Sequence, residues 1–171
     1  DTLMLFANPT NKVTLNYENI KKISKKLYTV MEELSYKIIS DGEGIKKLTK
    51  ITVKNAKSKS QAKNIAFAIC NSPLVKTAIA GEDANWGRVV MAIGKTNEKV
   101  IQNNLTIKFG KILLAKNGER NRRVNLSKVD NYMKKKLIEI EVNLNIGKHS
   151  KIVFGNDLNN EYISINADYR S

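Results

Sequence analysis

The chain has 171 residues, a length that fits one domain and allows a hydrophobic core without disulfides or metal. Hydrophobic residues make up 42% and charged residues 27%, a globular composition that excludes a disordered or low-complexity protein. No apolar run approaches the roughly 18 residues that span a bilayer, and the first residues lack a secretory signal pattern. The single cysteine, Cys70, excludes an internal disulfide. We therefore expect a cytoplasmic protein without a membrane partner.

The net charge of +14 suggests nucleic-acid binding, because clustered Lys and Arg side chains neutralise phosphates. The basic residues are, however, spread over nearly every segment of the chain. They form no cluster with aromatic side chains of the kind that stacks on bases. A basic nucleic-acid-binding protein therefore remains an alternative function, and the leading interpretation has no nucleic-acid partner.

Apolar periodicity predicts two strands and two helices in the first 70 residues. In chain order these are a strand-like run, a long helix, a strand and a helix opened by a capping box: 3–7, 17–40, 48–53 and from Ser58 onward. The long helix has apolar residues every three or four positions, and the glycines at 42 and 44 end it. Cys70 lies on the apolar side of the second helix, where we expect a buried, unreactive thiol.

The second half of the chain predicts a mixture of short helices and strands. Two short helices separated by Gly81-Glu82-Asp83 are expected within 72–94, and a basic helix with a serine N-cap over 127–136. Strands are expected at 105–109, 111–115, 138–144, 152–154 and 162–165. Because the elements mix without a regular βαβ repeat, the pattern indicates an α+β fold. No second-domain boundary is visible, so we expect a single domain over 1–171.

The sequence has no Cys/His cluster for zinc, no P-loop and no Rossmann glycine pattern. The only histidine, His149, is expected in an exposed polar turn. Three polar or glycine-rich patches stand out instead, at 41–44, 74–88 and 165–171. Each patch alone is explained by a structural role, as a helix end, a helix start and a chain terminus.

Together and in this order, the three patches are similar to the sequence motifs of one known protein family. The chain resembles the ornithine acetyltransferase (glutamate N-acetyltransferase) family along nearly all its length. The similarity rests on five matching segments: Asp1-Thr2-Leu3 with Ala7-Asn8, the DGEG at 41–44, SPLVKTAIAGEDANWGRV at 72–89, Asp157-Leu158 with Tyr162, and INADYRS at 165–171.

The resemblance implies a glutamate N-acetyltransferase of arginine biosynthesis. In this family a precursor cleaves itself before a threonine, which then carries acetyl from N-acetylornithine to glutamate by a ping-pong route that releases ornithine and N-acetylglutamate. No metal or cofactor is implied, although bifunctional members also accept acetyl-CoA as the donor. Thr2 does not match this nucleophile, because its neighbours match a later family segment. We therefore expect the nucleophile upstream of residue 1, no catalytic residue in this chain, and no activity from the chain alone.

Three substrate-binding residues follow from the same resemblance: Glu43, Asn166 and Ser171. A carboxylate at 43 suits a cationic amine, the amide at 166 can both donate and accept, and Ser171 places a hydroxyl beside the terminal carboxylate. Lys46 stands where the family usually has threonine, and its charge either weakens recognition of a cationic substrate or points to solvent. The residues 86–88, Trp-Gly-Arg, are expected to have a structural role.

The resemblance also implies the architecture and the partners. The chain is expected to be the C-terminal part of the small (beta) subunit, in a layered αββα-type domain that the large (alpha) subunit of the same precursor completes. Family members assemble as hetero-oligomers such as heterotetramers. An amidase or peptidase relative of the same fold is a further alternative, which the residues 166–171 disfavour because that block belongs to the acetyltransferases.

Overall fold

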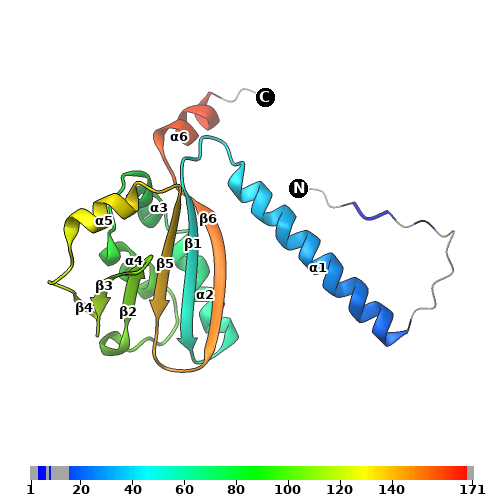
Figure 1. Ribbon diagram of the computed structural model, residues 1–171, viewed down its shortest axis with the longest axis horizontal. Coiled ribbons are helices and arrows are strands. Elements are labelled where there is room, and N and C mark those ends of the chain that lie inside the picture. Colours follow the sequence, from blue (N-terminus) through cyan, green and yellow to red (C-terminus); the bar gives the residue numbers. More distant parts are fainter. Residues whose placement is uncertain (1–3, 7, 9–15, 169–171) are drawn as a thin grey trace. The chain divides into compact units, whose positions relative to one another are not determined.

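The computed structural model describes residues 4–6, 8 and 16–168, which fall in two units, 1–36 and 37–171. Figure 1 shows the helices and strands of both units, and each unit is described by itself. The expectation of a single domain over residues 1–171 stays a prediction.

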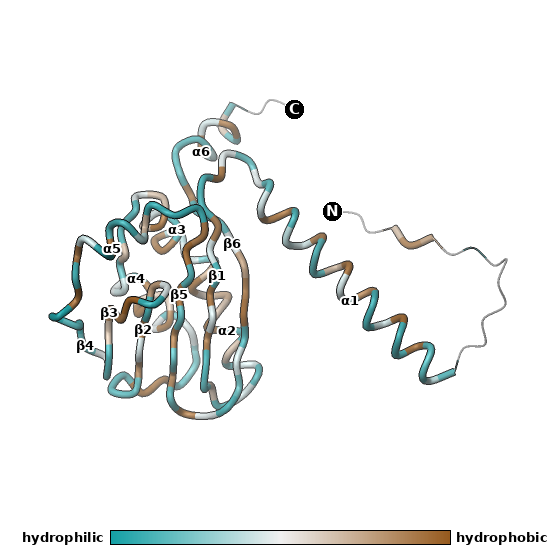
Figure 2. Tube along the Cα trace, in the orientation of Figure 1, coloured by the Kyte–Doolittle hydropathy of each residue, from teal (hydrophilic) through white to brown (hydrophobic). Residues whose placement is uncertain are grey.

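The long helix α1 (Tyr17–Ser40) has the bounds that the apolar periodicity predicted. The Asn16 side chain accepts a hydrogen bond from the backbone N–H of Asn19 at 2.8 Å, as an N-cap does. Hydrophobic and hydrophilic residues alternate along the helix (Figure 2), and none of its residues is buried. Residues 4–6 have no regular secondary structure, and the rest of the strand predicted at 3–7 lies outside the described residues.

The second unit contains one mixed six-stranded sheet with the order β4-β3-β2-β5-β1-β6. Its strands are β1 (Leu48–Ala56), β2 (Thr106–Phe109), β3 (Ile112–Lys116), β4 (Glu119–Arg120), β5 (Leu137–Asn143) and β6 (His149–Asn156). The neighbours β1 and β5 run parallel, and every other pair is antiparallel. Together with the helices below, this sheet confirms the α+β class.

Five helices accompany the sheet: α2 (Lys59–Cys70), α3 (Pro73–Ala80), α4 (Trp86–Gly94), α5 (Leu126–Met133) and α6 (Asn160–Ala167), with a 3-10 turn at Gln102–Asn104. Figure 1 shows α2, α3 and α4 on one face of the sheet, and α2 packs on β1 and β6. Ser58, Ser72 and Asn85 cap these three helices through their side chains. The helix from Ser58 and the two short helices within 72–94 are thereby confirmed.

The hydrophobic core lies between this helix layer and the sheet. Residues alternate in β1 so that Ile51 and Val53 are fully buried, while their neighbours Thr52 and Lys54 are not. Ile140 of β5 pairs with Ile51 and is also fully buried. The core is completed from the helix side by buried residues of α2, which include Ala62, Ile65, Ala66 and Ile69.

The opposite face of the sheet carries charged side chains that pair across the strands. Lys50 contacts Glu139 at 2.9 Å, and Lys54 and Lys108 contact Glu141 at 2.6 and 3.6 Å. The hydrogen bond from the Lys54 ammonium lowers the pKa of Glu141. Because carboxylates partner these lysines, this face does not form the uninterrupted basic surface that nucleic-acid binding favours.

The sheet and its helices supply one helix layer and one strand layer of the expected αββα arrangement. Within residues 16–168, all strands belong to the same sheet, and helices α2, α3 and α4 cover one of its faces. The remaining two layers of the arrangement stay an expectation for the full-length protein.

The strand predicted at 162–165 was wrong in kind, and the helix predicted at 127–136 was wrong in its bounds and its N-cap. The strand expected at 162–165 is part of helix α6, because the Asn159 side chain accepts the backbone N–H of Tyr162 at 3.1 Å and opens a helix there. The basic helix expected at 127–136 is α5, which begins one residue earlier and ends at Met133. Its N-cap is Asn125, whose side chain accepts from Lys128 N–H at 3.1 Å, and not Ser127.

Cys70 is buried, as the sequence predicted, and this burial gives a testable expectation for its chemistry. The residue is 6% exposed and packs against Gly155, where a Cβ atom would collide with its Sγ. Burial raises the pKa of the Cys70 thiol, and the charge of Lys76 only partly opposes this shift. Because the thiolate is the reactive form, we expect no labelling of Cys70 by an aromatic disulfide reagent in the folded protein at neutral pH.

The measurement is mass spectrometry of the Cys70 peptide after timed labelling. Labelling in concentrated urea is the control, and there the peptide should react completely. Rapid labelling of the folded protein, at a rate similar to that in urea, would show that the thiol is accessible and contradict this packing.

Candidate functional site

Glu43 lies in the turn between α1 and β1, and the conformation of this turn depends on the following glycine. Gly44 has a φ of +64°, in the left-handed region that favours glycine. A Cβ atom at Gly44 would lie 2.6 Å from the backbone nitrogen of Tyr162, in the first turn of α6. The turn that contains Glu43 therefore lies directly against the start of α6.

Asn166 is on α6, and the structure brings its side chain to Glu43. Its Nδ2 donates to Glu43 Oε2 at 3.2 Å and to the carbonyl oxygen of Tyr162 at 2.9 Å. Both side chains are exposed, so a ligand can reach them. Two of the three residues predicted from the sequence are thus in contact, although 123 positions separate them. The third, Ser171, lies outside the described residues.

Lys46 is paired with the first turn of α6. Its Nζ lies 3.2 Å from Glu161 Oε2, and the two side chains are 65% and 53% exposed. The ammonium group of Lys46 therefore has the carboxylate of Glu161 as its partner. The side chains of Glu43, Lys46 and Glu161 have two formal negative charges and one positive charge, so together they have a net charge of −1.

Lys47, the next residue, is buried and connects this region to the turn after α3. It is 8% exposed, and its ammonium donates to Glu82 Oε1 at 2.8 Å and to the carbonyl oxygens of Met133 and Lys135 at 2.7 and 3.4 Å. Glu82 has a φ of +59°, a conformation that costs a residue with a side chain on the order of 1 kcal/mol. The ion pair with Lys47 helps to hold this strained turn.

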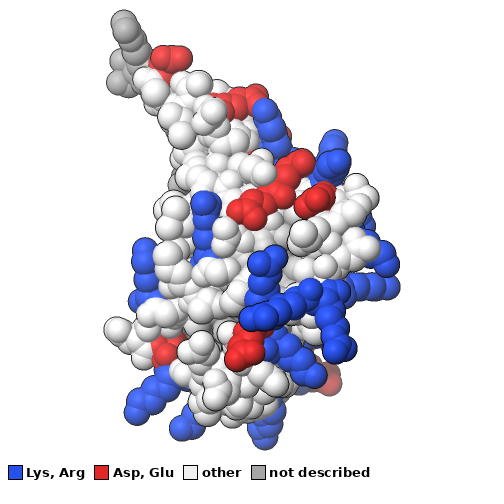
Figure 3. Space-filling model, turned by 90° about the vertical axis from the view of Figure 1, so that its left-hand side faces the viewer, with Lys and Arg blue, Asp and Glu red and all other residues white. Residues whose placement is uncertain are grey.

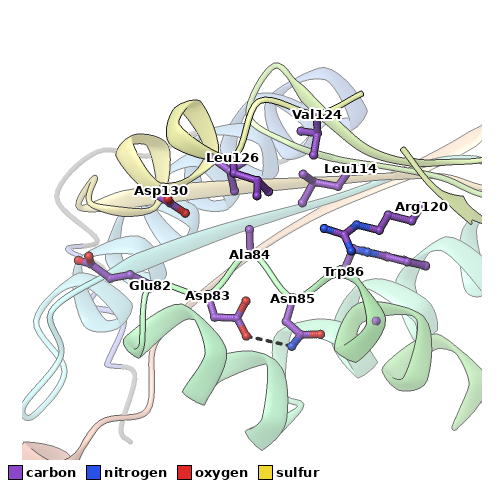
Figure 4. Close-up of a pocket in the computed structure, with 12 residues that line it drawn as sticks. Glu82, Asp83, Ala84, Asn85, Trp86, Leu114, Arg120, Val124, Leu126 and Asp130 are labelled. Carbon is purple, nitrogen blue, oxygen red and sulfur yellow. Dashed lines mark hydrogen bonds between the residues drawn. The ribbon is translucent and has the colours of Figure 1, made fainter. Parts of the chain in front are cut away.

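Residues 82–87 of the 72–89 block line a pocket with a volume of about 480 Å³. In Figure 4, the side chain of Ala84 points toward Leu114 and Leu126, whereas Asp83 and Asn85 point away from them and are hydrogen-bonded to each other at 2.9 Å. Figure 3 shows one face of the molecule, on which most of the acidic side chains lie in the upper part of the view and most of the basic side chains lie lower. The pocket is lined by Glu82, Asp83, Ala84, Asn85, Trp86, Gly87, Leu114, Arg120, Val124, Leu126, Val129 and Asp130. Glu43 and Asn166 are not among these residues.

The residues 86–88 hold helices together. Trp86 begins α4 and is one of the partly buried residues packed against the core. The Arg88 guanidinium donates to the carbonyl oxygen of Leu74 at 2.8 Å and to Thr77 Oγ1 at 3.2 Å, and so joins α4 to α3. These contacts fit the structural role expected for the block.

The structure gives no functional role to His149 and no metal-binding group in the residues that it describes. His149 is the first residue of β6 and pairs with Ala56 of β1, so the expected polar turn is wrong for this residue. Within residues 16–168 and the few described before them, no group of three His, Cys, Asp or Glu is arranged to hold a metal ion. The same part of the chain contains no helix with the length and apolar character needed to cross a bilayer.

Comparisons with known proteins define the class of this α+β chain. A crystal structure of arginine biosynthesis bifunctional protein ArgJ from Bacillus halodurans has the same fold, with a TM-score of 0.84 and 36% sequence identity. The match covers 92% of this chain and 75% of that one. A model described as the ArgJ family matches residues 1–171. The chain belongs to the ArgJ family.

Curated relatives agree with this assignment. Proteins called arginine biosynthesis bifunctional protein ArgJ from Bartonella henselae and Mesorhizobium japonicum are 46% identical over 178 residues and 48% identical over 180 residues. Both matches cover 100% of this chain and 43% of the relative. The chain therefore spans less than half the length of the curated relatives that it matches.

The Lys47–Glu82 ion pair gives a stability prediction with a matched control. The Lys50–Glu139 pair is three residues away and has nearly the same distance, 2.9 against 2.8 Å, but its lysine side chain is 32% exposed against 9% for Lys47. We expect Lys47→Met to lower the free energy of unfolding by about 1–3 kcal/mol, because it leaves buried acceptors unsatisfied. Lys50→Met should cost less than about 1 kcal/mol, as surface pairs do.

Urea unfolding of the full-length protein, followed by circular dichroism, measures both changes. Equal effects of the two substitutions would contradict the special role given to the buried ammonium.

Proposed function

We propose that this chain forms the substrate-binding part of a glutamate N-acetyltransferase of arginine biosynthesis. The reaction transfers acetyl from N-acetylornithine to glutamate and releases ornithine and N-acetylglutamate. Support comes from membership of the ArgJ family and from the names of the relatives, which describe those proteins as bifunctional in arginine biosynthesis.

The observation that supports the proposal most directly is the contact between Glu43 and Asn166. A carboxylate accepts charge-assisted hydrogen bonds from a substrate ammonium group, and an amide side chain can donate to a carbonyl or carboxylate oxygen. N-acetylornithine offers both kinds of partner. Because the two side chains are exposed, their mutual hydrogen bond at 3.2 Å can be exchanged for bonds to the substrate.

The chemistry of transfer is proposed to use a threonine in the part of the full-length protein that this chain does not span. The threonine hydroxyl attacks the acetyl carbonyl, and the C–N bond to ornithine breaks as the hydroxyl proton passes to the leaving amine. The amine of glutamate then attacks the acetyl ester, and the threonine oxygen leaves and regains a proton. In both steps Glu43 and Asn166 bind and orient the amino acid.

The remaining features of the proposal concern partners and location. We expect the chain to act in a cytoplasmic hetero-oligomer with a large subunit made from the same precursor, and to be inactive alone. Acetyl-CoA is a second acetyl donor if this protein, like its relatives by name, is bifunctional. No metal or other cofactor is needed for the two acyl transfers.

Substitution of Glu43 and Asn166 in the full-length protein tests the proposed function. We expect Glu43→Gln and Asn166→Ala each to lower kcat/KM for N-acetylornithine by roughly 10–100-fold, the loss that follows from a hydrogen bond to a charged group worth about 1.5–3 kcal/mol. Ornithine release in the presence of glutamate is the measurement. Glu119→Gln removes an exposed carboxylate from the short strand β4 and should leave the rate unchanged.

Two results would overturn the proposal. One is a folded full-length protein that transfers no acetyl group from N-acetylornithine to glutamate. The other is an active protein in which both substitutions behave like Glu119→Gln.

The Lys46–Glu161 pair gives a second kinetic prediction. If Glu161 partners the Lys46 charge, Glu161→Gln frees that ammonium to compete for Glu43. We expect KM for N-acetylornithine to rise by up to about fivefold, since exposed ion pairs are worth about 0.2–1 kcal/mol. The additional substitution Lys46→Thr should restore the original KM. If KM stays high in the double variant, Glu161 affects the site by another route.

A further inference from the structure

Glu43 and Asn166 are exposed, so the contact between them is too weak to determine where they lie. Their placement has another source. The strands β1 and β6 are antiparallel, and Leu48 pairs with Asn156. The residues that precede β1 and those that follow β6 therefore lie together at the same end of the two strands. This brings the turn that contains Glu43 near the start of α6.

Asp157 is buried at this end of the strands. It is 3% exposed, and its Oδ1 accepts the backbone N–H groups of Lys46 and Lys47 at 3.0 and 3.1 Å. Its own N–H donates to the carbonyl oxygen of Lys47 at 3.0 Å. A buried carboxylate needs several donors to offset its desolvation, and these bonds supply them from the segment that follows Glu43.

Asn159 extends the connection to the helix. Its Nδ2 donates to Asp157 Oδ2 at 3.1 Å and to the carbonyl oxygen of Gly44 at 2.7 Å. Its Oδ1 accepts the backbone N–H of Tyr162 and caps α6. One side chain thus bonds the turn that contains Glu43 and the helix that contains Asn166.

We propose that Asp157 and Asn159 are positioning residues of the substrate site, and that they fix the Glu43 turn to helix α6. The inference rests on the proposed function, because it assigns these residues to the placement of Glu43 and Asn166. Neither residue needs to touch the substrate. Each acts through backbone groups, so the loss of either displaces Glu43 relative to Asn166, and displacement of binding groups by about 1 Å is enough to cost up to 100-fold in rate.

The substitution Asn159→Ser separates the two roles of this side chain. Serine is a good N-cap and keeps α6 capped, but it has no amide to donate to Gly44 and Asp157. The matched control is Asn125→Ser, which makes the same change at the N-cap of α5. In the full-length protein we expect Asn159→Ser to raise KM for N-acetylornithine about tenfold, and Asn125→Ser to leave KM within twofold of the original value.

A double variant distinguishes positioning from general damage. If Asn159 acts through Glu43, then Asn159→Ser should change kcat/KM less than twofold when Glu43→Gln is already present, because interacting sites are not additive. The inference is overturned if KM is unchanged in Asn159→Ser while Glu43→Gln is impaired. It is also overturned if the losses of the two single variants multiply in the double variant.

Hydrogen exchange gives a readout that does not depend on activity. Asn159→Ser should speed amide exchange in residues 44–47 and 160–167 together, and Asn125→Ser should change neither segment. If the protein shows no acetyl transfer, the proposed function fails, and the exchange result alone decides whether Asn159 fixes the turn to the helix. Unchanged exchange in both segments would overturn that connection.

Discussion

The burial of the Asp157 carboxylate is the constraint on which the candidate site depends. A carboxylate at 3% exposure must be compensated by donors, and the nearest ones are the backbone N–H groups of Lys46 and Lys47 and the amide of Asn159. Meeting this requirement brings two segments more than 100 positions apart into one arrangement. The exposed groups that we assign to substrate binding are held by buried groups that do not face the substrate.

The sheet makes this arrangement possible. Because β1 pairs with β5 on one side and β6 on the other, the residues just before β1 are surrounded by ends of several elements. Lys47 extends from this point to Glu82 and to the carbonyl oxygen of Met133 at the end of α5. The family motif around Glu82 is thereby connected to the motif around Glu43, although residues 82–87 line a pocket that does not include Glu43.

Local signals in the sequence predicted much of the fold. The three- and four-residue spacing of apolar residues gave the bounds of α1, and alternation identified β1 and β5. The predictions failed at asparagine caps, where Asn125 and Asn159 begin helices that were expected to start at a serine or to be a strand. In the segment after Asn159, the apolar residues with high strand propensity led to the prediction of a strand, but the structure has a helix that the Asn159 side chain caps.

The candidate site was predictable only in part, for a physical reason. Glu43 and Asn166 were found by resemblance to a family, and the structure brings them together. Asp157 was noticed as part of a matching segment, but its role could not be assigned, because it bonds to backbone groups that any residue at 46 and 47 would provide. The pattern of the sequence allowed the charge of Lys46 to oppose a cationic substrate or to point to solvent, and only the structure identifies Glu161 as the partner of Lys46.

A crystal structure of the full-length protein with bound ornithine tests the central claim most directly. The account predicts polar atoms of the ligand within about 3.2 Å of the Glu43 carboxylate and the Asn166 amide, with the bond between these side chains replaced. Ornithine bound elsewhere, for example in the pocket between Glu82 and Asp130, with the Glu43–Asn166 contact intact, would contradict it.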